Sequence, residues 1–288
     1  GDFDGMTDER DERPLLAGVC GDPIAQSKSP RLFRHWFERY GLAGHYVPLK
    51  VAAPDFPDAI RGLQRAGFRG VNCTIPHKIS ALEIADEISD SARAIGAANT
   101  LTFRRDRSIF ADNTDAFGFI ENLRAGAPGW DPSSAPAVML GAGGAARAGI
   151  FALLEAGVPA VRVLNRTREK AETLRDHFGE RVEAISWNER HTALAGSGVI
   201  VNSTSLGMIG NPPLDLVLTD APTDAVVTDM VYNPLETPLL AAGKARGMIA
   251  VDGLGMLLHQ ARPGFRAWFE IDPEVTADLR AACLEGSQ

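Results

Sequence analysis

A glycine-rich turn between two apolar runs constrains the fold of this chain more than any other feature. Ala137–Leu140 is an uncharged apolar run of the kind that forms a buried parallel strand, and Val161–Leu164 is a second one. The six residues after the first run have the spacing G-x-G-x-x-A, and Ala148–Ala156 then has the composition of a helix, which ends at Gly157. Strand, turn, helix and strand make one βαβ unit of a dinucleotide-binding fold.

Each small residue of this turn has a predicted role. Gly141 allows the tight turn, Gly143 lets the backbone approach a pyrophosphate, and Ala146 permits close packing of helix on strand. The helix N-terminus offers unpaired N–H groups to phosphate. The predicted phosphate-binding residues are Gly141, Ala142, Gly143, Gly144 and Ala145.

The end of the second strand predicts which dinucleotide is bound. A site for NAD places Asp or Glu there to hold the ribose 2′-hydroxyl, but this chain has no carboxylate at that point. Basic and polar side chains that suit a 2′-phosphate stand there instead. They are Asn165, Arg166, Thr167, Arg168 and Lys170. NADP is therefore the expected cofactor; the alternative is a glycine turn in an α/β domain that binds no nucleotide.

Further apolar runs extend the βαβ unit into a sheet. Runs that begin at residues 137, 161, 182, 199, 225 and 248 predict six strands with helices or loops between them. This alternation is typical of a doubly wound parallel sheet, with ligands at the C-terminal ends of the strands. Residues 253–269 and 273–284 are expected to form one helix each. Residues 1–13 are acidic and polar and are expected to be a disordered tail.

Composition narrows the function class. The net charge of −8 argues against a nucleic-acid surface, which needs a basic face. Three widely spaced cysteines make no disulfide framework and fit a reducing compartment, so a cytoplasmic location is expected. No apolar run reaches the length of a membrane span. His77 has no partner at ligand spacing, so no metal is expected.

The N-terminal half contains three polar positions that two interpretations fit. Ser29 precedes Pro30, so it is either a helix N-cap or a ligand contact beside Ser27. Lys78 falls in the first turn of a predicted helix, where a lysine opposes the helix dipole, and this placement points to function. Asp115 fits a helix N-cap, and propensity alone favours that interpretation.

A series of motifs in these and later segments resembles the shikimate dehydrogenase family and keeps that family's order along nearly the whole chain. The motifs are Ser-Lys-Ser-Pro at 27–30, Asn-Cys-Thr-Ile-Pro-His-Lys at 72–78, Gly-Ala-Ala-Asn-Thr at 96–100, Asn-Thr-Asp at 113–115, Gly-Ala-Gly-Gly-Ala at 141–145, Asn-Arg-Thr at 165–167, Asn-Ser-Thr-Ser-Leu-Gly-Met at 202–208, Asp-Met-Val-Tyr-Asn-Pro at 229–234 and Asp-Gly-Leu-Gly-Met-Leu-Leu-His-Gln at 252–260.

The resemblance implies an N-terminal α/β substrate domain and a Rossmann-like NADP domain with a cleft between them. The expected bounds are 14–114 with 253–288 for the first and 115–252 for the second. Lys78 and Asp115 match the family's catalytic pair. The implied substrate-binding residues are Ser27, Ser29, Thr74, Asn99, Asp115, Tyr232 and Gln260. Besides the two phosphate-binding segments, the implied cofactor-binding residues are Met230 and Gly253 near the nicotinamide, and Asp90.

The resemblance also implies a reaction: reversible NADPH-dependent reduction of 3-dehydroshikimate to shikimate, in chorismate and aromatic amino-acid biosynthesis. Two alternatives stay open, a quinate/shikimate dehydrogenase that uses NAD and a non-catalytic NADP-dependent metabolite sensor. The expected partner is a small-molecule substrate, with neither nucleic acid nor membrane, and a homodimer is left open. Phe33 and Ala116 depart from the family pattern, which has His and Gly there, so altered packing near the site is expected.

Overall fold

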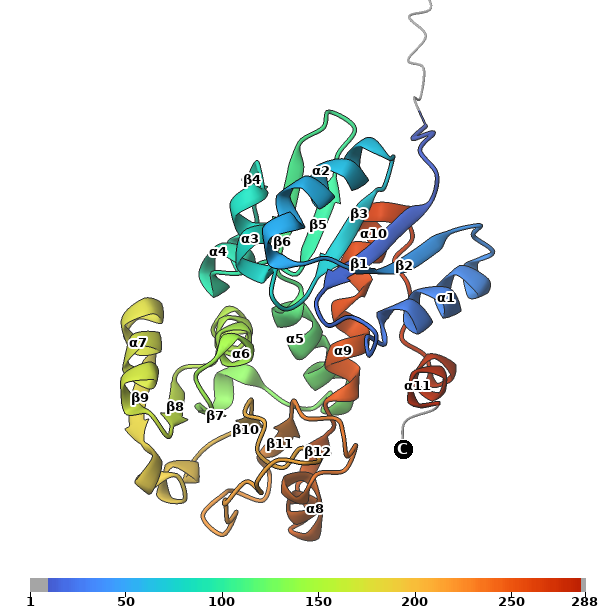
Figure 1. The fold of residues 1–288 in the computed structure, drawn as a ribbon. Helices are drawn as coiled ribbons and strands as arrows, with labels where there is room; N and C mark the ends of the chain where they lie inside the picture. The colour runs from blue at the N-terminus through green and yellow to red at the C-terminus, as the bar shows by residue number, and fades with distance from the viewer. Residues whose placement is uncertain (1–9, 286–288) are drawn as a thin grey trace, which may run out of the picture.

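The computed structural model describes residues 10–285, which form two six-stranded sheets with helices packed around them (Figure 1). The first sheet, sheet A, has the order β2-β1-β3-β5-β6-β4 and mixes parallel and antiparallel pairs. Its strands are β1 (Leu16–Gly21), β2 (His45–Lys50), β3 (Gly70–Cys73), β4 (Glu87–Ile88), β5 (Thr100–Phe103) and β6 (Ile109–Asp112).

Helices cover both faces of sheet A, and its central strands are therefore buried on both sides. One face packs on α2 (Phe56–Arg65), α3 (Lys78–Ile84) and α4 (Asp90–Ile95). The other face carries an aromatic cluster formed with α1 (Ser29–Tyr40), α9 (Leu254–Gln260), α10 (Arg262–Phe269) and α11 (Ala277–Leu284). The end of the chain therefore packs on the sheet formed by its beginning (Figure 1).

The second sheet, sheet B, is entirely parallel and has the order β12-β11-β10-β7-β8-β9, which confirms the predicted doubly wound topology. Its strands are β7 (Ala137–Leu140), β8 (Val161–Asn165), β9 (Val182–Ser186), β10 (Val199–Asn202), β11 (Val226–Asp229) and β12 (Ile249–Val251). Its helices are α5 (Asp115–Gly126), α6 (Gly144–Glu155), α7 (Arg168–Phe178) and α8 (Pro238–Ala245). The strand order reverses between β7 and β10, where this fold opens a crevice for ligands.

Two long connections join the sheets at one place. In Figure 1, α5 follows sheet A and α9 follows sheet B, and the two helices lie side by side between the sheets. Gly255 makes this approach possible, since a Cβ there would lie 1.9 Å from Asn122 Oδ1 of α5. The two crossings therefore place the C-terminal edges of both sheets near each other.

Several element bounds differ from the sequence-based expectations. The helix expected over 253–269 is two helices that meet at Ala261, with Pro263 at the start of the second. The helix predicted to contain Lys78 in its first turn is α3, which begins at Lys78 and ends at Ile84, and α4 follows as a separate helix capped by the Ser89 hydroxyl. The last helix begins only at Ala277, after its Thr276 cap.

Of the residues predicted to form a tail, 1–9 lie outside the described range, and residues 11–13 make contacts with sheet A. Arg13 donates hydrogen bonds to the Phe103 carbonyl, and the buried Arg69 donates to the Arg13 carbonyl. Asp11 pairs with Arg13, and the hydrogen bonds and charges of this pair lower the pKa of the Asp11 carboxyl to about 2. Residues 11–13 are therefore held against sheet A rather than belonging to a tail.

Candidate active site

A cavity of about 430 Å³ between the two sheets collects the predicted catalytic and substrate-binding residues. Its walls come from loops at the C-terminal ends of strands in sheet A, from the start of α5, from α9 and from sheet B. The predicted residues that line it are Ser27, Ser29, Thr74, Lys78, Asn99, Asp115, Ala145, Met230, Tyr232, Gly253 and Gln260. These side chains are far apart in the sequence, and the fold brings them to one space.

Lys78 and Asp115 contact each other in the wall of this cavity. The Nζ atom of Lys78 lies 3.5 Å from Oδ2 of Asp115, and both side chains keep contact with solvent at 38% and 23% exposure. Each residue is the first of its helix, α3 for Lys78 and α5 for Asp115. A single long, partly exposed contact leaves hydrogens on the ammonium group free for a ligand oxygen.

Asn99 fixes the other oxygen of Asp115. The backbone N–H of Thr114 donates to Asn99 Oδ1 at 2.9 Å, so the amide nitrogen of Asn99 must point the opposite way. That nitrogen donates to Asp115 Oδ1 at 3.1 Å and to Thr114 Oγ1 at 3.0 Å. Gln260 joins this cluster through Oε1, because its own amide nitrogen donates to the Leu257 carbonyl. The orientation of both amides is thus set by backbone groups.

The structure decides between the two interpretations of the helix-start residues. Ser29 is the first residue of α1, the cap position of that helix is Lys28, and the N–H of Ser29 donates to the Ser27 hydroxyl at 3.3 Å. Thr114 occupies the cap position of α5, and the carboxylate of Asp115 does not cap it. Both side chains line the cavity instead, so the N-cap interpretation is wrong for each.

Tyr232, in the loop after β11, also lines the cavity. Burial raises the pKa of its hydroxyl above the usual value, so the group stays a neutral donor and acceptor. Met230, two residues earlier, lies against Gly253, where a Cβ would come within 2.6 Å of both the Asp229 and Met230 carbonyl oxygens. The absence of a side chain at Gly253 therefore allows this close approach.

The glycine turn after β7 lies at the crevice of sheet B. Gly141 has φ of +106°, and a Cβ there would lie 2.5 Å from Ser203 Oγ in the loop after β10. A Cβ at Gly143 or at Gly144, which begins α6, would meet no other protein atom within 4 Å. Open space in front of free helix N–H groups suits a pyrophosphate. The helix starts four residues earlier than the sequence suggested.

The two arginines of the basic cluster after β8 differ in their ion pairing. Arg168 pairs with Glu172 one turn along α7, at 3.1 Å, and the Asn165 amide donates to the Thr167 carbonyl. Among the described residues, Arg166 has no ion-pair partner; its guanidinium lies 6.0 Å from the centre of the Trp187 ring. Arg166 is thus the arginine of this cluster more available to an anionic ligand. Asp90, exposed at the start of α4, does not line the cavity.

A buried polar cluster supports the loops that carry Met230 and Tyr232. Asp229 Oδ1 accepts from the Asn202 amide and from the Val231 N–H, both at 3.0 Å, and Oδ2 accepts from the Thr237 hydroxyl at 2.8 Å. Burial raises the pKa of Asp229 to about 6, against the opposing effect of these hydrogen bonds. His259 of α9 shows the reverse: burial, with Arg262 and Arg280 nearby, lowers its pKa to about 4.

Sequence reasoning did not assign Asn72, which lines the cavity. It accepts a hydrogen bond of 2.7 Å from the Tyr46 hydroxyl and donates to Thr100 Oγ1. The Tyr46 ring stacks on Phe33 with centroids 3.9 Å apart, so Phe33 packs behind the site without lining it. The available signal was the motif at 72–78, which begins with Asn72. Its burial beside the cavity, however, depends on the tertiary structure.

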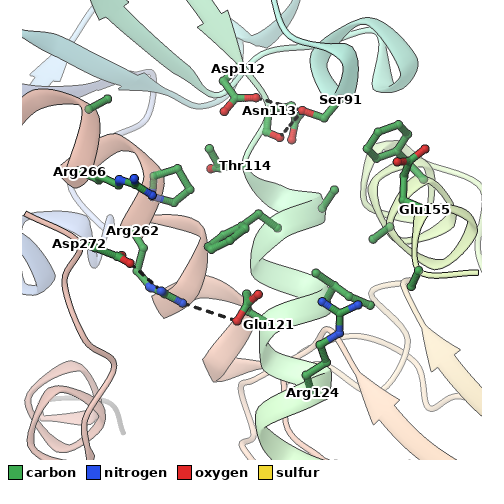
Figure 2. A pocket seen from close by; sticks show the side chains of 18 residues that line it. Ser91, Asp112, Asn113, Thr114, Glu121, Arg124, Glu155, Arg262, Arg266 and Asp272 are labelled. Carbon is green, nitrogen blue, oxygen red and sulfur yellow. Dashed lines mark hydrogen bonds and ion pairs between the residues drawn. The ribbon is translucent and has the colours of Figure 1, made fainter. Parts of the chain in front are cut away.

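A second cavity, of about 860 Å³, lies on the other side of the start of α5 (Figure 2). None of the predicted site residues lines it. Figure 2 shows that Arg262 lies between Glu121 and Asp272 and that Asp112 accepts from Ser91, whereas Arg124, Glu155 and Arg266 have no ion-pair partner among the described residues. The predicted catalytic and substrate-binding residues line the smaller cavity, which is therefore the candidate active site.

No group of three or more His, Cys, Asp or Glu residues within 10–285 is arranged to hold a metal ion. Over the same residues, no helix has the length and apolar character that crossing a bilayer requires.

Comparison with known families places both halves of the chain. The family model for the shikimate dehydrogenase substrate binding domain matches residues 19–101, and the model for shikimate / quinate 5-dehydrogenase matches residues 129–209. A curated relative, shikimate dehydrogenase (NADP(+)) of Dinoroseobacter shibae, is 56% identical over 269 residues, which cover 93% of this chain and 97% of that protein.

Solved structures of similar proteins share the whole fold. Shikimate 5-dehydrogenase of Thermus thermophilus, in complex with NADP(H) and shikimate, is 36% identical with a TM-score of 0.81, covering 93% of this chain and 98% of that one. Quinate dehydrogenase of Corynebacterium glutamicum, in complex with NAD, is 28% identical with a TM-score of 0.86, covering 94% and 99%. The fold is thus shared by relatives that differ in substrate and cofactor.

Proposed function

Because this chain belongs to the shikimate dehydrogenase family, we propose that it catalyses the reversible NADPH-dependent reduction of 3-dehydroshikimate to shikimate, a step in chorismate and aromatic amino-acid biosynthesis. The observation that carries the proposal is the single cavity in which Lys78 and Asp115 face Ala145 and Met230. A substrate held by the pair would lie beside Met230 and Gly253, where the nicotinamide of a dinucleotide bound at the glycine turn would reach the cavity.

The residues present fit a phosphorylated dinucleotide. Space in front of Gly143 and Gly144 admits a pyrophosphate at the start of α6, and Arg166 is available for a 2′-phosphate. Asn165, Thr167, Arg168 and Lys170 would form the rest of that subsite. When bound, the nicotinamide supplies the hydride for the carbonyl carbon. Met230 and Gly253 would hold the ring at the cavity.

Lys78 is the proposed proton donor in the direction of reduction. Both oxygens of Asp115 accept hydrogen bonds, one from Asn99 and one from Lys78, so the carboxyl group is held beside the lysine. The ammonium of Lys78 has further hydrogens for the carbonyl oxygen, whose developing charge it would stabilise before giving it a proton. Asp115 would hold Lys78 in place and accept from a ring hydroxyl.

The remaining polar residues would orient the substrate. Ser27, Ser29, Thr74 and Tyr232 offer hydroxyls, and Asn99 and Gln260 offer amides, around the same space. Hydroxyls and amides suit a compound with several hydroxyl groups, and the helix-start serines suit a carboxylate. We assign substrate binding and catalysis to residues 14–114 and 253–288, and cofactor binding to residues 115–252. Asp90 is a weaker cofactor candidate because of its exposed position.

A second candidate function is oxidation of quinate with NAD, favoured by the similarity to the Corynebacterium glutamicum quinate dehydrogenase. The lack of an acid after β8 and the availability of Arg166 speak for NADP. A third, a non-catalytic NADP-dependent sensor, would have no use for the Lys78–Asp115 pair. A cytoplasmic location and a homodimer remain predictions.

One spectrophotometric experiment separates these functions. The purified chain is assayed at 340 nm with shikimate or quinate, each with NADP or NAD. We expect the highest kcat/KM for shikimate with NADP. A preference for quinate with NAD would replace the proposal by the second candidate, and cofactor binding without turnover would favour the sensor.

A further inference from the structure

Trp187 lies against the arginine of the basic cluster that has no acidic partner among the described residues. Ser186 at the end of β9 is the register partner of Asn165 at the end of β8, so the next residues of each strand, Trp187 and Arg166, emerge side by side. The Arg166 guanidinium is centred 6.0 Å from the Trp187 ring centre. This distance is within the range of a cation–π contact.

The indole is itself held firmly. Its apolar body packs against the buried cluster on the α8 face of sheet B. On another side, the Arg190 guanidinium lies 5.3 Å from the ring centre and donates to the Trp187 carbonyl. Asp215 holds Arg190 in this position. Arg190 donates a hydrogen bond of 2.6 Å to the backbone carbonyl of Asp215 and one of 2.8 Å to the Asp215 carboxylate. Trp187 is therefore a fixed surface rather than a mobile side chain.

We propose that Trp187 is a positioning residue for cofactor choice, which holds the guanidinium of Arg166 where the 2′-phosphate of NADP binds. The inference rests on the proposed use of NADP. An exposed arginine that must be ordered on binding loses side-chain entropy, and a flat aromatic partner reduces that loss beforehand. Trp187 would thus favour a nucleotide with a 2′-phosphate over one without it, without touching the phosphate itself.

The test uses two small probes that differ by the phosphate in question, 2′,5′-ADP and 5′-AMP, with calorimetric titration of the full chain. The variant is Trp187→Leu, which keeps an apolar side chain against the cluster and removes the aromatic face. We expect binding of 2′,5′-ADP to weaken about threefold to tenfold, with 5′-AMP little changed. Trp187→Met replaces it if the leucine variant does not fold.

Two controls isolate the route of the effect. Trp130→Leu removes another half-buried indole, which packs against the core on the other face of sheet B, and we expect no change with either probe. In an Arg166→Gln background, Trp187→Leu should have no further effect on 2′,5′-ADP, because a residue that acts through Arg166 shows no effect without it.

The outcomes keep the inference and the proposed function apart. If the wild-type chain shows no preference for 2′,5′-ADP, the NADP assignment fails and the inference with it. If the preference is present and Trp187→Leu leaves it intact, weakens both probes equally, or acts equally in the Arg166→Gln background, only the role of Trp187 is overturned.

Discussion

The two sides of the active-site cavity are built from different parts of the polypeptide. On the sheet A side, side chains of loops and helix starts supply the polar groups, and the Lys78–Asp115 contact is long and partly exposed. On the sheet B side, Ala145, Met230 and Gly253 line the cavity, and the proposed phosphate donors are backbone N–H groups of the glycine turn at the start of α6. A reacting site needs groups that can change partners, whereas a phosphate site needs donors in fixed positions.

The largest effect that this comparison predicts is at Lys78. In Lys78→Ala the sheet A side loses its ammonium, so kcat should fall at least about a hundredfold, while NADPH affinity from fluorescence titration stays close to wild type. Lys244→Ala, at an exposed lysine of α8 that pairs with Glu236, is the control and should keep full activity. Near-normal turnover of Lys78→Ala would remove the lysine from the mechanism.

Two glycine substitutions test the sheet B side. A methyl group at Gly143 meets open space in the protein, so Gly143→Ala should keep the melting temperature. It would crowd a bound pyrophosphate, a clash of about 1–3 kcal/mol, which weakens NADPH binding roughly tenfold to a hundredfold. Gly141→Ala should instead lower the melting temperature, because Gly141 has a positive φ and a Cβ there would clash with Ser203 Oγ.

Calorimetric melting and NADPH titration of the two variants distinguish these effects. Equal loss of stability in both would show that the turn serves the fold alone, and unchanged NADPH affinity in Gly143→Ala would place the pyrophosphate elsewhere.

A smaller effect is the change of folding stability with pH, to which Asp229 and His259 contribute in opposite directions. Asp229 takes up a proton at higher pH in the folded chain than its ordinary pKa of 3.8 allows, so its contribution to stability decreases as pH rises from about 4 to about 6. His259 has a lowered pKa of about 4 against 6.5, so its contribution is complete above pH 6.5 and is lost as pH falls to about 4. The two slopes oppose each other.

Single variants should reveal the slopes separately. Asp229→Asn keeps an acceptor oxygen for Asn202 and Val231, so the remaining His259 effect should make the melting temperature rise with pH between about 4 and 6.5. His259→Asn should shift the slope toward a decrease with rising pH. Melting curves at half-unit steps of pH check this, and parallel curves for wild type and both variants would contradict it.

The sequence alone predicted the doubly wound parallel topology of sheet B and the position of its glycine turn. These follow from local patterns: uncharged apolar runs form strands buried on both faces, and the glycine spacing has one backbone use. Local patterns were less reliable at helix ends, as the break at Ala261 shows. At the starts of α1 and α5, capping propensity pointed to Ser29 and Asp115, whereas the structure turns both side chains into the cavity.

Only the tertiary structure decided which polar residues meet. Lys78, Asp115 and Gln260 belong to helices that are distant in the sequence, and no periodicity relates them. The resemblance to a family named them; the packing of α5 on α9 brings Asp115 near Gln260, and α3 places Lys78 beside Asp115. The contact of Trp187 with Arg166 likewise follows from the register of β8 and β9. Chemistry of this kind depends on distances of a few ångströms between groups on separate elements, and a one-dimensional pattern does not contain those distances.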